Sequence, residues 1–311
     1  MGIPYLNRFI KENSPQGIHK LHFADLSGKT IVVDIMVYLY KFHSEDLLMS
    51  NLYSMISLFR YYKITPIFIF DGKSPPEKKD LLNKRNDEKR LAKEEYLQLL
   101  NNPTQNTMTK NKLLSLKKKI VYLTTEILDT VKMFMDAYGV TYITAEGEAD
   151  PLCAQFVIKQ YAYACLTEDM DQFIYGCPRI LRYFNLNKET VHLYNLKKIL
   201  RQLKLTQTEL KLIGVVSGTD YNIDQHINLF KVLKMFKRFK YIKEKNFYNW
   251  LAKNTNYIIN LDRLNLIYDL FSLSNIDITK IIKKSSIINK KINYIALNKL
   301  LRPYGFIFLN N

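Results

Sequence analysis

Three short apolar runs, each followed within two residues by an aspartate, place the strongest limit on how this chain can fold. Runs of this length, almost unbroken in hydrophobicity and rich in β-branched and aromatic residues, are typical of strands buried on both faces of a largely parallel sheet. We therefore predict an α/β fold with a mixed, largely parallel sheet flanked by helices. The runs are residues 30–33, 66–70 and 163–167, and the acids after them are Asp34, Asp71 and Asp169.

Further carboxylates stand near the ends of predicted segments. Ligand sites of such sheets lie at the carboxyl ends of the strands, so the three aspartates should meet at one edge. Asp171 lies two residues after Asp169, and in an extended chain the two side chains would share a side. Glu148 and Asp150 open a predicted helix that runs to about Gln160. The candidate cluster comprises Asp34, Asp71, Glu148, Asp150, Asp169, Asp171 and Asp220.

Crowded carboxylates repel one another and need cations to remain ionised. An all-oxygen set suits Mg²⁺ or Mn²⁺ better than zinc. Two such ions about 3.5 to 4 Å apart can activate a water and stabilise the leaving oxygen of a phosphoryl displacement. Any one of these acids taken alone would more often cap a helix or lie in a solvated loop. Their shared position at strand ends favours a metal site.

The overall charge points to a polyanionic partner. The chain has 46 Lys and Arg against 29 Asp and Glu, a formal charge of +17, which favours nucleic acid or an anionic membrane. Its 311 residues and 47% hydrophobic content exclude a disordered protein and allow one large domain or a core with an appendage. No apolar stretch approaches the roughly 18 to 20 residues of a membrane span, and the N-terminus has no signal-peptide pattern. We expect a soluble, intracellular protein.

The cysteines do not suggest a metal site or a disulfide framework. Cys153, Cys165 and Cys177 are odd in number and include no CxxC pair. We expect reduced thiols in the core.

A basic segment follows Asp71. Residues 73–119 hold thirteen Lys and Arg against six acids, and two helices are predicted at about 77–100 and 111–138, on either side of a polar turn at 101–106. Lys78 and Arg85 are seven residues apart, close to two helical turns, and so project from one face. A merely solvated charged face is the alternative. The excess of bases favours a helical excursion that binds an anion.

Six blocks in order across residues 1–221 resemble the signature of the flap endonuclease family of structure-specific 5′ nucleases, in the PIN-like nuclease superfamily. The resemblance implies a PIN-like nuclease core at residues 1–222, and a metal-dependent phosphodiesterase that cuts near junctions of single- and double-stranded DNA during replication, repair or recombination. The blocks are Met1-Gly2-Ile3, Val33-Asp34 with Tyr38-Leu39-Tyr40, FDGK at 70–73, GEAD at 147–150, TEDMD at 167–171 and GTDY at 218–221.

The resemblance also implies roles for single residues. The seven carboxylates match the family's acids for two Mg²⁺ ions, for which Mn²⁺ can substitute. Lys78 and Arg85 match bases that reach the scissile phosphate beneath a helical arch at about 74–133, which is inserted after the second predicted strand. Tyr40 matches an aromatic that stacks on a base, a role that Tyr38 could hold instead. Further candidate DNA contacts are Gly2, Lys84, Lys117, Lys118, Lys119, Lys231, Lys234 and Lys237.

The branch of the superfamily stays open at this stage. Asp150 stands where flap endonucleases usually carry Glu, whereas the exonuclease branch uses Asp. The alternatives are a 5′ to 3′ exonuclease acting on DNA or RNA ends, and a non-catalytic relative that binds DNA junctions. The complete acid set argues against the second. We expect the protein at sites of DNA replication, in the nucleus or, for a large DNA virus, in the cytoplasm.

A second duplex contact of the family, a helix-two-turn-helix, would correspond to about residues 209–245. Residues 222–229 lack the glycine that a close backbone approach and a potassium ion would need, so a K⁺ site there is not supported. A basic face follows at Lys231, Lys234 and Lys237 and could bind phosphates, or could be an ordinary solvated helix face.

Residues 223–311 are predicted to form a basic helical region with Trp250 in its core. Near the C-terminus there is no glutamine-anchored aromatic motif, so binding to a sliding clamp is not supported. We expect a monomer.

Overall fold

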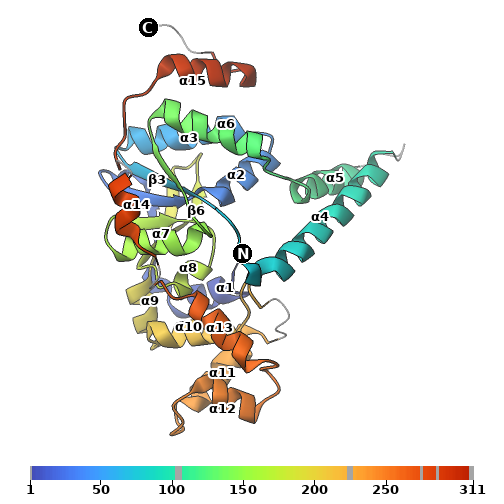
Figure 1. Ribbon diagram of the computed structural model, residues 1–311, viewed down its shortest axis with the longest axis vertical. Coiled ribbons are helices and arrows are strands. Elements are labelled where there is room, and N and C mark those ends of the chain that lie inside the picture. The colour runs from blue at the N-terminus through green and yellow to red at the C-terminus, as the bar shows by residue number, and fades with distance from the viewer. Residues whose placement is uncertain (1, 102–106, 223–226, 274–275, 285–286, 308–311) are drawn as a thin grey trace.

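The centre of the protein is a seven-stranded mixed sheet (Figure 1). The computed structural model describes residues 2–101, 107–222, 227–273, 276–284 and 287–307. The strand order is β1-β7-β6-β5-β2-β3-β4. Strands β6, β5, β2, β3 and β4 pair in parallel, whereas β7 joins β6, and β1 joins β7, in antiparallel pairs. The bounds are β1 Ile18–His22, β2 Thr30–Asp34, β3 Thr65–Phe70, β4 Thr141–Thr144, β5 Ala164–Leu166, β6 Arg179–Asn185 and β7 Thr190–Asn195.

Alternate residues of the central strands enter two separate cores. In β2, Val32 faces one cluster, while Ile31 and Val33 face the other. Strand β3 repeats this with Ile67 on the first face and Phe68 on the second. Both faces are therefore buried, as the unbroken apolar runs predict.

Two groups of helices cover these faces. Residues of α1 and α7–α14 belong to the first core, and residues of α2, α3, α6 and α15 to the second. The bounds are α1 Leu6–Asn13, α2 Ile35–Ser44, α3 Leu48–Tyr61, α4 Lys79–Leu100, α5 Thr107–Lys119, α6 Thr125–Tyr138, α7 Ala149–Ile158, α8 Asp171–Ile174, α9 Leu196–Leu203, α10 Gln207–Val216, α11 Leu229–Phe239, α12 Phe247–Asn254, α13 Leu261–Leu270, α14 Ile278–Lys284 and α15 Tyr294–Leu301.

Helices α4 and α5 form an arm that projects from the body (Figure 1). Their buried residues are few, namely Leu81, Ala92 and Leu116. The arm follows β3, the third strand, rather than the second, because the sequence does not reveal the polar edge strand β1.

The helix predicted at 111–138 is in fact two helices. It breaks at residues 120–124, where the Thr124 side chain accepts a hydrogen bond from the backbone N–H of Ile127 and so caps α6. Helix α6 packs on the body against β4 and α15. The expected arch boundary near residue 133 stays a prediction. Of the predicted polar turn at 101–106, residues 102–106 lie outside the described residues.

Helices α11–α14 share the first core with the sheet, whereas α15 packs in the second core. Trp250 and Leu251 of α12 are buried in the same cluster as Val32, which confirms the expected position of Trp250. The division at residue 222 stays a prediction. The three cysteines are free and buried, as expected. Within the described ranges, none of the helices is both long enough and apolar enough to span a membrane.

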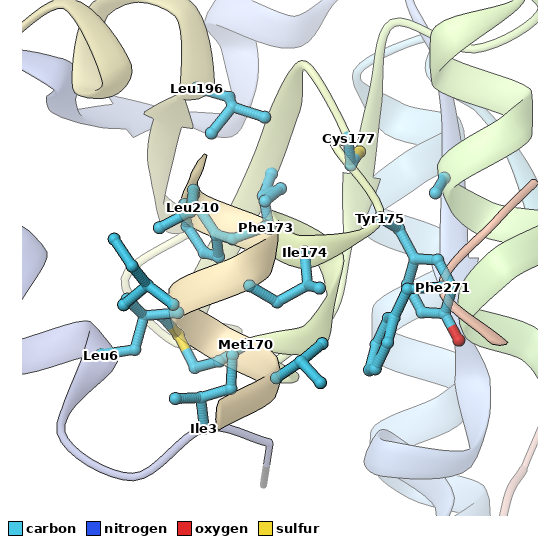
Figure 2. Packing of buried hydrophobic residues seen from close by; sticks show 14 of the residues in the cluster. Ile3, Leu6, Met170, Phe173, Ile174, Tyr175, Cys177, Leu196, Leu210 and Phe271 are labelled. Carbon is cyan, nitrogen blue, oxygen red and sulfur yellow. The ribbon is translucent and has the colours of Figure 1, made fainter. Parts of the chain in front are cut away.

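The N-terminal segment packs beside the loop between β5 and α8. Ile3 and Leu6 lie in one apolar cluster with Met170 and Phe173 (Figure 2). This packing brings Gly2 against Asp169 in that loop and Asp171 at the start of α8.

Candidate metal centre and nucleic-acid interface

Asp34, Asp71 and Asp169 stand at the carboxyl ends of three adjacent strands. Asp34 ends β2, Asp71 directly follows β3, and Asp169 lies in the loop after β5. Because β5, β2 and β3 are parallel neighbours, the three acids reach one edge of the sheet, as the sequence predicts.

Three of the other four acids lie at the starts of helices, and the fourth lies in a turn. Glu148 immediately precedes α7 and Asp150 lies in its first turn. Asp171 is the first residue of α8, and Asp220 lies in the turn after α10. The chain is not extended between Asp169 and Asp171: the backbone N–H of Asp171 donates to Asp169 Oδ1 at 2.9 Å. Helix α8 begins at Asp171, so the chain turns here and does not keep the extended geometry expected from the two-residue spacing.

Three polar side chains that the motifs did not single out hold the acids in place. Thr167 Oγ1 donates to Asp34 Oδ2 at 2.9 Å, and Gln172 Nε2 donates to Asp150 Oδ1 at 3.0 Å. Burial, followed by the charge of Asp169, raises the pKa of Asp150 well above its usual range.

The third of these side chains is Tyr221. Its hydroxyl donates to Glu148 Oε2. The only sequence signal for these supports is adjacency, since Thr167 and Tyr221 lie inside the blocks that contain the acids and Gln172 directly follows one of them.

The cluster holds more negative charge than its surroundings neutralise. Burial, and next the charge of Asp71, raises the pKa of Asp34 to about 7. Burial, then Asp169 and Asp220, raises the pKa of Asp171 well above its usual range. Desolvation and mutual repulsion both disfavour the ionised forms, so a cation is needed to keep them charged.

Two features of this position fit a bound cation. Asp171 Oδ1 is buried and has no hydrogen-bond partner among the residues that the structure describes. A Cβ at Gly2 would lie 2.5 Å from Asp169 Oδ1 and 2.6 Å from Asp171 Oδ1, so only glycine lets the N-terminal backbone pass these oxygens. As the side chains stand, no three His, Cys, Asp or Glu groups among the residues that the structure describes form a metal cage. The donor set fits hard divalent cations, and its members would have to draw closer around one.

The base of the arm supplies cations to these acids. Lys78 Nζ pairs with Glu148 and lies 3.4 Å from Asp220 Oδ2. Arg85 Nη2 donates to the same Asp220 oxygen at 3.0 Å. Burial would lower the pKa of Lys78, but Glu148 and Asp220 raise it above its usual value. Both bases therefore project toward the acid cluster from one face of the arm.

The two tyrosines of the second block differ in environment. Tyr38 is buried in the second core, whereas 42% of Tyr40 is exposed. The base-stacking role assigned to Tyr40 stays a prediction.

The other arm bases that were predicted to contact DNA differ in whether an acid pairs with them. Lys117 pairs with Asp46 in the loop between α2 and α3, so it ties the arm to the body. Lys84, Lys118 and Lys119 are exposed.

The basic face of α11 is amphipathic, as expected. Leu229, Val232 and Phe236 are buried, and the predicted contacts Lys231, Lys234 and Lys237 are exposed. The loop that would form the potassium site, residues 223–226, lies outside the described residues.

Two models of one protein family match the chain. Residues 1–92 match the XPG N-terminal domain, and residues 139–220 match the XPG I-region. The two matches together span more than half of the chain and contain all seven acids. The chain belongs to the XPG and flap endonuclease family. The region between the matches, 93–138, holds the end of α4, all of α5 and helix α6.

Curated relatives in this family are 28% identical to the chain over the residues that align. Flap endonuclease 1 of Candida glabrata is 28% identical over 241 residues, which are 71% of this chain and 61% of the relative. Flap endonuclease 1 of Methanococcus aeolicus is 28% identical over 239 residues, covering 72% of this chain and 70% of the relative. The chain spans a little over six tenths of the length of the first relatives it matches.

Solved structures share the fold over nearly the whole chain. The catalytic core of Rad2 in complex with DNA substrate superposes with a TM-score of 0.70 at 18% identity, covering 97% of this chain and 95% of that one. Flap endonuclease-1 from Methanococcus jannaschii superposes with a TM-score of 0.65 at 22% identity, covering 92% and 90%. These likenesses extend the family fold to the C-terminal helices.

Proposed function

We propose that this protein is a divalent-metal-dependent, structure-specific 5′ nuclease that hydrolyses DNA phosphodiesters at 5′ flaps, nicks or related junctions. One observation carries the proposal: the seven carboxylates gather where their charges act on one another, and Lys78 and Arg85 at the base of the arm pair with Glu148 and Asp220 among them. The flap endonuclease relatives and the DNA complex of the Rad2 core support this substrate class.

The acid cluster is the proposed metal centre. Asp34, Asp71, Glu148, Asp150, Asp169, Asp171 and Asp220 would hold the Mg²⁺ or Mn²⁺ ions. When bound, such ions supply an activated water and stabilise the leaving oxygen. Thr167, Gln172 and Tyr221 orient the acids by hydrogen bonds, as outer partners of metal ligands commonly do.

Lys78 and Arg85 are the proposed phosphate-binding cations. Both bases pair with carboxylates in the free protein. When a scissile phosphate binds, they would exchange these carboxylate partners for phosphate oxygens. Cations held at the point where negative charge grows stabilise the transition state more than the bound substrate.

The DNA itself is held by charge and by one exposed ring. Lys231, Lys234 and Lys237 on α11 are the proposed contacts to duplex phosphates. Gly2, Lys84, Lys118 and Lys119 are proposed contacts nearer the acid cluster and the arm. Tyr40 is the proposed stacking partner of a base, because a π-face tolerates any sequence.

A substrate panel tests the proposal. The protein is incubated with Mg²⁺ and end-labelled DNAs of one sequence, prepared as 5′ flap, nicked, gapped and blunt duplex, and product lengths are read. We expect cleavage at the flap junction, with the blunt duplex cut at least about tenfold more slowly. RNA ends and a free 5′ end in the same panel detect the exonuclease alternative, for which the product would be mononucleotides. Preferential cutting of RNA ends, or equal rates on all DNAs, would refute the proposal.

A further inference from the structure

A lysine of the arm lies against two exposed tyrosines that belong to other parts of the chain. Lys89 Nζ on α4 is 5.3 Å from the ring centroid of Tyr40 on α2 and 4.3 Å from that of Tyr122. The same ammonium donates to the backbone carbonyl of Val121 at 2.9 Å. Tyr122 stands in the break between α5 and α6, so this break brings its ring to the arm.

Both rings remain accessible. Tyr40 is 42% exposed and Tyr122 is 50% exposed. The negative face of an aromatic ring can hold a cation, and it can equally stack on a nucleobase. Exposed rings beside a basic groove are the usual make-up of sites for single-stranded nucleic acid.

The charge around Lys89 favours an anionic guest. Burial, and next the positive charge of Arg85, lowers the pKa of Lys89, so the groups around its ammonium do not fully compensate its charge. A phosphate oxygen would supply the missing negative charge.

Lys89 lies on the side of the arm that leads to the acid cluster. Lys78 immediately precedes α4, and Arg85 and Lys89 lie about one turn apart on one face of that helix. Lys78 and Arg85 contact the acids. A strand whose phosphate reaches the acids along this face would pass Lys89 and both rings.

We propose that Tyr122 is a second base-stacking residue, and that with Tyr40 and Lys89 it forms a binding site for one unpaired nucleotide of the strand that approaches the acid cluster along the arm. The inference rests on the proposed function and deepens it. The base lies on the Tyr122 ring, and the Lys89 ammonium leaves that ring face to pair with the adjoining phosphate. Because stacking recognises no particular base, the site reads single-strandedness rather than sequence.

A purely structural role for Tyr122 makes a different prediction. In that case its ring covers the Lys89 side chain and fixes the base of the arm, and its loss would weaken binding whatever stands at the nucleotide position. The two roles are separated by substrates that lack one base.

Binding is measured without divalent metal, so that no cleavage occurs, on flap DNAs with 2-aminopurine at successive unpaired positions near the junction. The variants are Tyr122→Leu, Tyr122→Phe and, as an exposed tyrosine on another helix, Tyr61→Leu, whose side chain is 78% exposed. We expect Tyr122→Leu to lose the fluorescence quenching at one position and about 5- to 20-fold in affinity, the equivalent of one stacked base. Tyr122→Phe and Tyr61→Leu should match the wild type.

The affinity is then measured for a flap DNA that carries an abasic nucleotide at the position where 2-aminopurine is quenched. We expect the wild type and Tyr122→Leu to bind this substrate alike. Equal losses on the intact and abasic substrates, or unchanged quenching and affinity in Tyr122→Leu, would overturn the inference. Failure of the proposed function looks different, since the wild type would then show no preference for flap DNA over blunt duplex.

Discussion

At the scale of single residues, the acid cluster stores electrostatic repulsion that a metal relieves. Asp34 shows this best, because it is buried, accepts a hydrogen bond from Thr167 and has a pKa raised to about 7. Asparagine at this position would keep the accepting oxygen and remove the charge.

We predict that Asp34→Asn raises the melting temperature of the metal-free protein at pH 8 by about 2 °C or more, since it removes a buried like charge. The raised pKa means that the folded wild type takes up a proton below about pH 7, so the advantage of the variant should shrink as the pH falls. Saturating Mg²⁺ should reverse the order. Thermal melts followed by circular dichroism measure all three effects, and a less stable variant at pH 8 in chelator would contradict the account.

Residue-level prediction succeeded where a side chain follows a strand directly. Asp34 and Asp71 could be placed because the ends of parallel strands share one edge. The hydrogen bonds from Gln172 and Tyr221 could not, because their partners lie 22 and 73 residues away in sequence and meet only after packing.

At the scale of elements, the arm combines a predictable helix with an unpredictable break. Helix α4 begins and ends close to its predicted bounds. The break at 120–124 carries no proline or glycine. It arises where the chain turns from the arm onto the body, with Thr124 capping α6, and such tertiary causes override local periodicity.

The two arm cations should act on chemistry more than on binding. We predict that Lys78→Ala and Arg85→Ala each slow single-turnover cleavage by about 10²- to 10³-fold while flap affinity stays within about threefold. Rapid-quench kinetics and equilibrium binding measure the rate and the affinity. Arg90→Ala, on the same helix but paired with Glu94 and exposed, is the matched control and should change neither. Normal rates with weakened binding would refute the assignment.

Helix α11 should act on binding more than on chemistry. We predict that Lys231→Ala, Lys234→Ala and Lys237→Ala combined weaken duplex binding and reduce its logarithmic salt slope by about 0.9 for each phosphate that the protein no longer neutralises. Lys240 is left intact because its ammonium pairs with Glu209 at 2.9 Å and supports the fold. Alanine at the exposed Lys20, Lys159 and Lys299 provides a control of equal charge. An unchanged salt slope would remove α11 from the interface.

At the scale of the whole molecule, the sequence predicts the central sheet well and its margins poorly. The buried strands can be recognised from their unbroken apolar runs, whereas β1, with His19, Lys20 and His22, has no such pattern. Helices α12–α14 complete the first core and α15 packs in the second, yet residues 246–311 carry no motif that would assign them a role. Packing, rather than local sequence, determines where they dock.

Metal choice follows from the donor set as a whole. We predict that Mg²⁺ or Mn²⁺ supports cleavage, that a chelator abolishes it, and that Ca²⁺ supports binding with little turnover, because its longer and looser coordination suits a two-metal displacement poorly. Product formation with each ion on one flap substrate measures this. Full activity with Zn²⁺ alone would argue against an all-oxygen site.

The most direct measurement of the central claim compares Asp171→Ala with Glu146→Ala on a flap substrate. Asp171 is buried with an oxygen that lacks a partner in the described part of the chain, whereas Glu146 is an exposed acid just ahead of Glu148. If the acids hold the catalytic metals, Asp171→Ala should lose at least about a hundredfold in single-turnover cleavage with Mg²⁺ while keeping duplex affinity, and Glu146→Ala should match the wild type. Cleavage by Asp171→Ala within tenfold of the wild type would contradict the account.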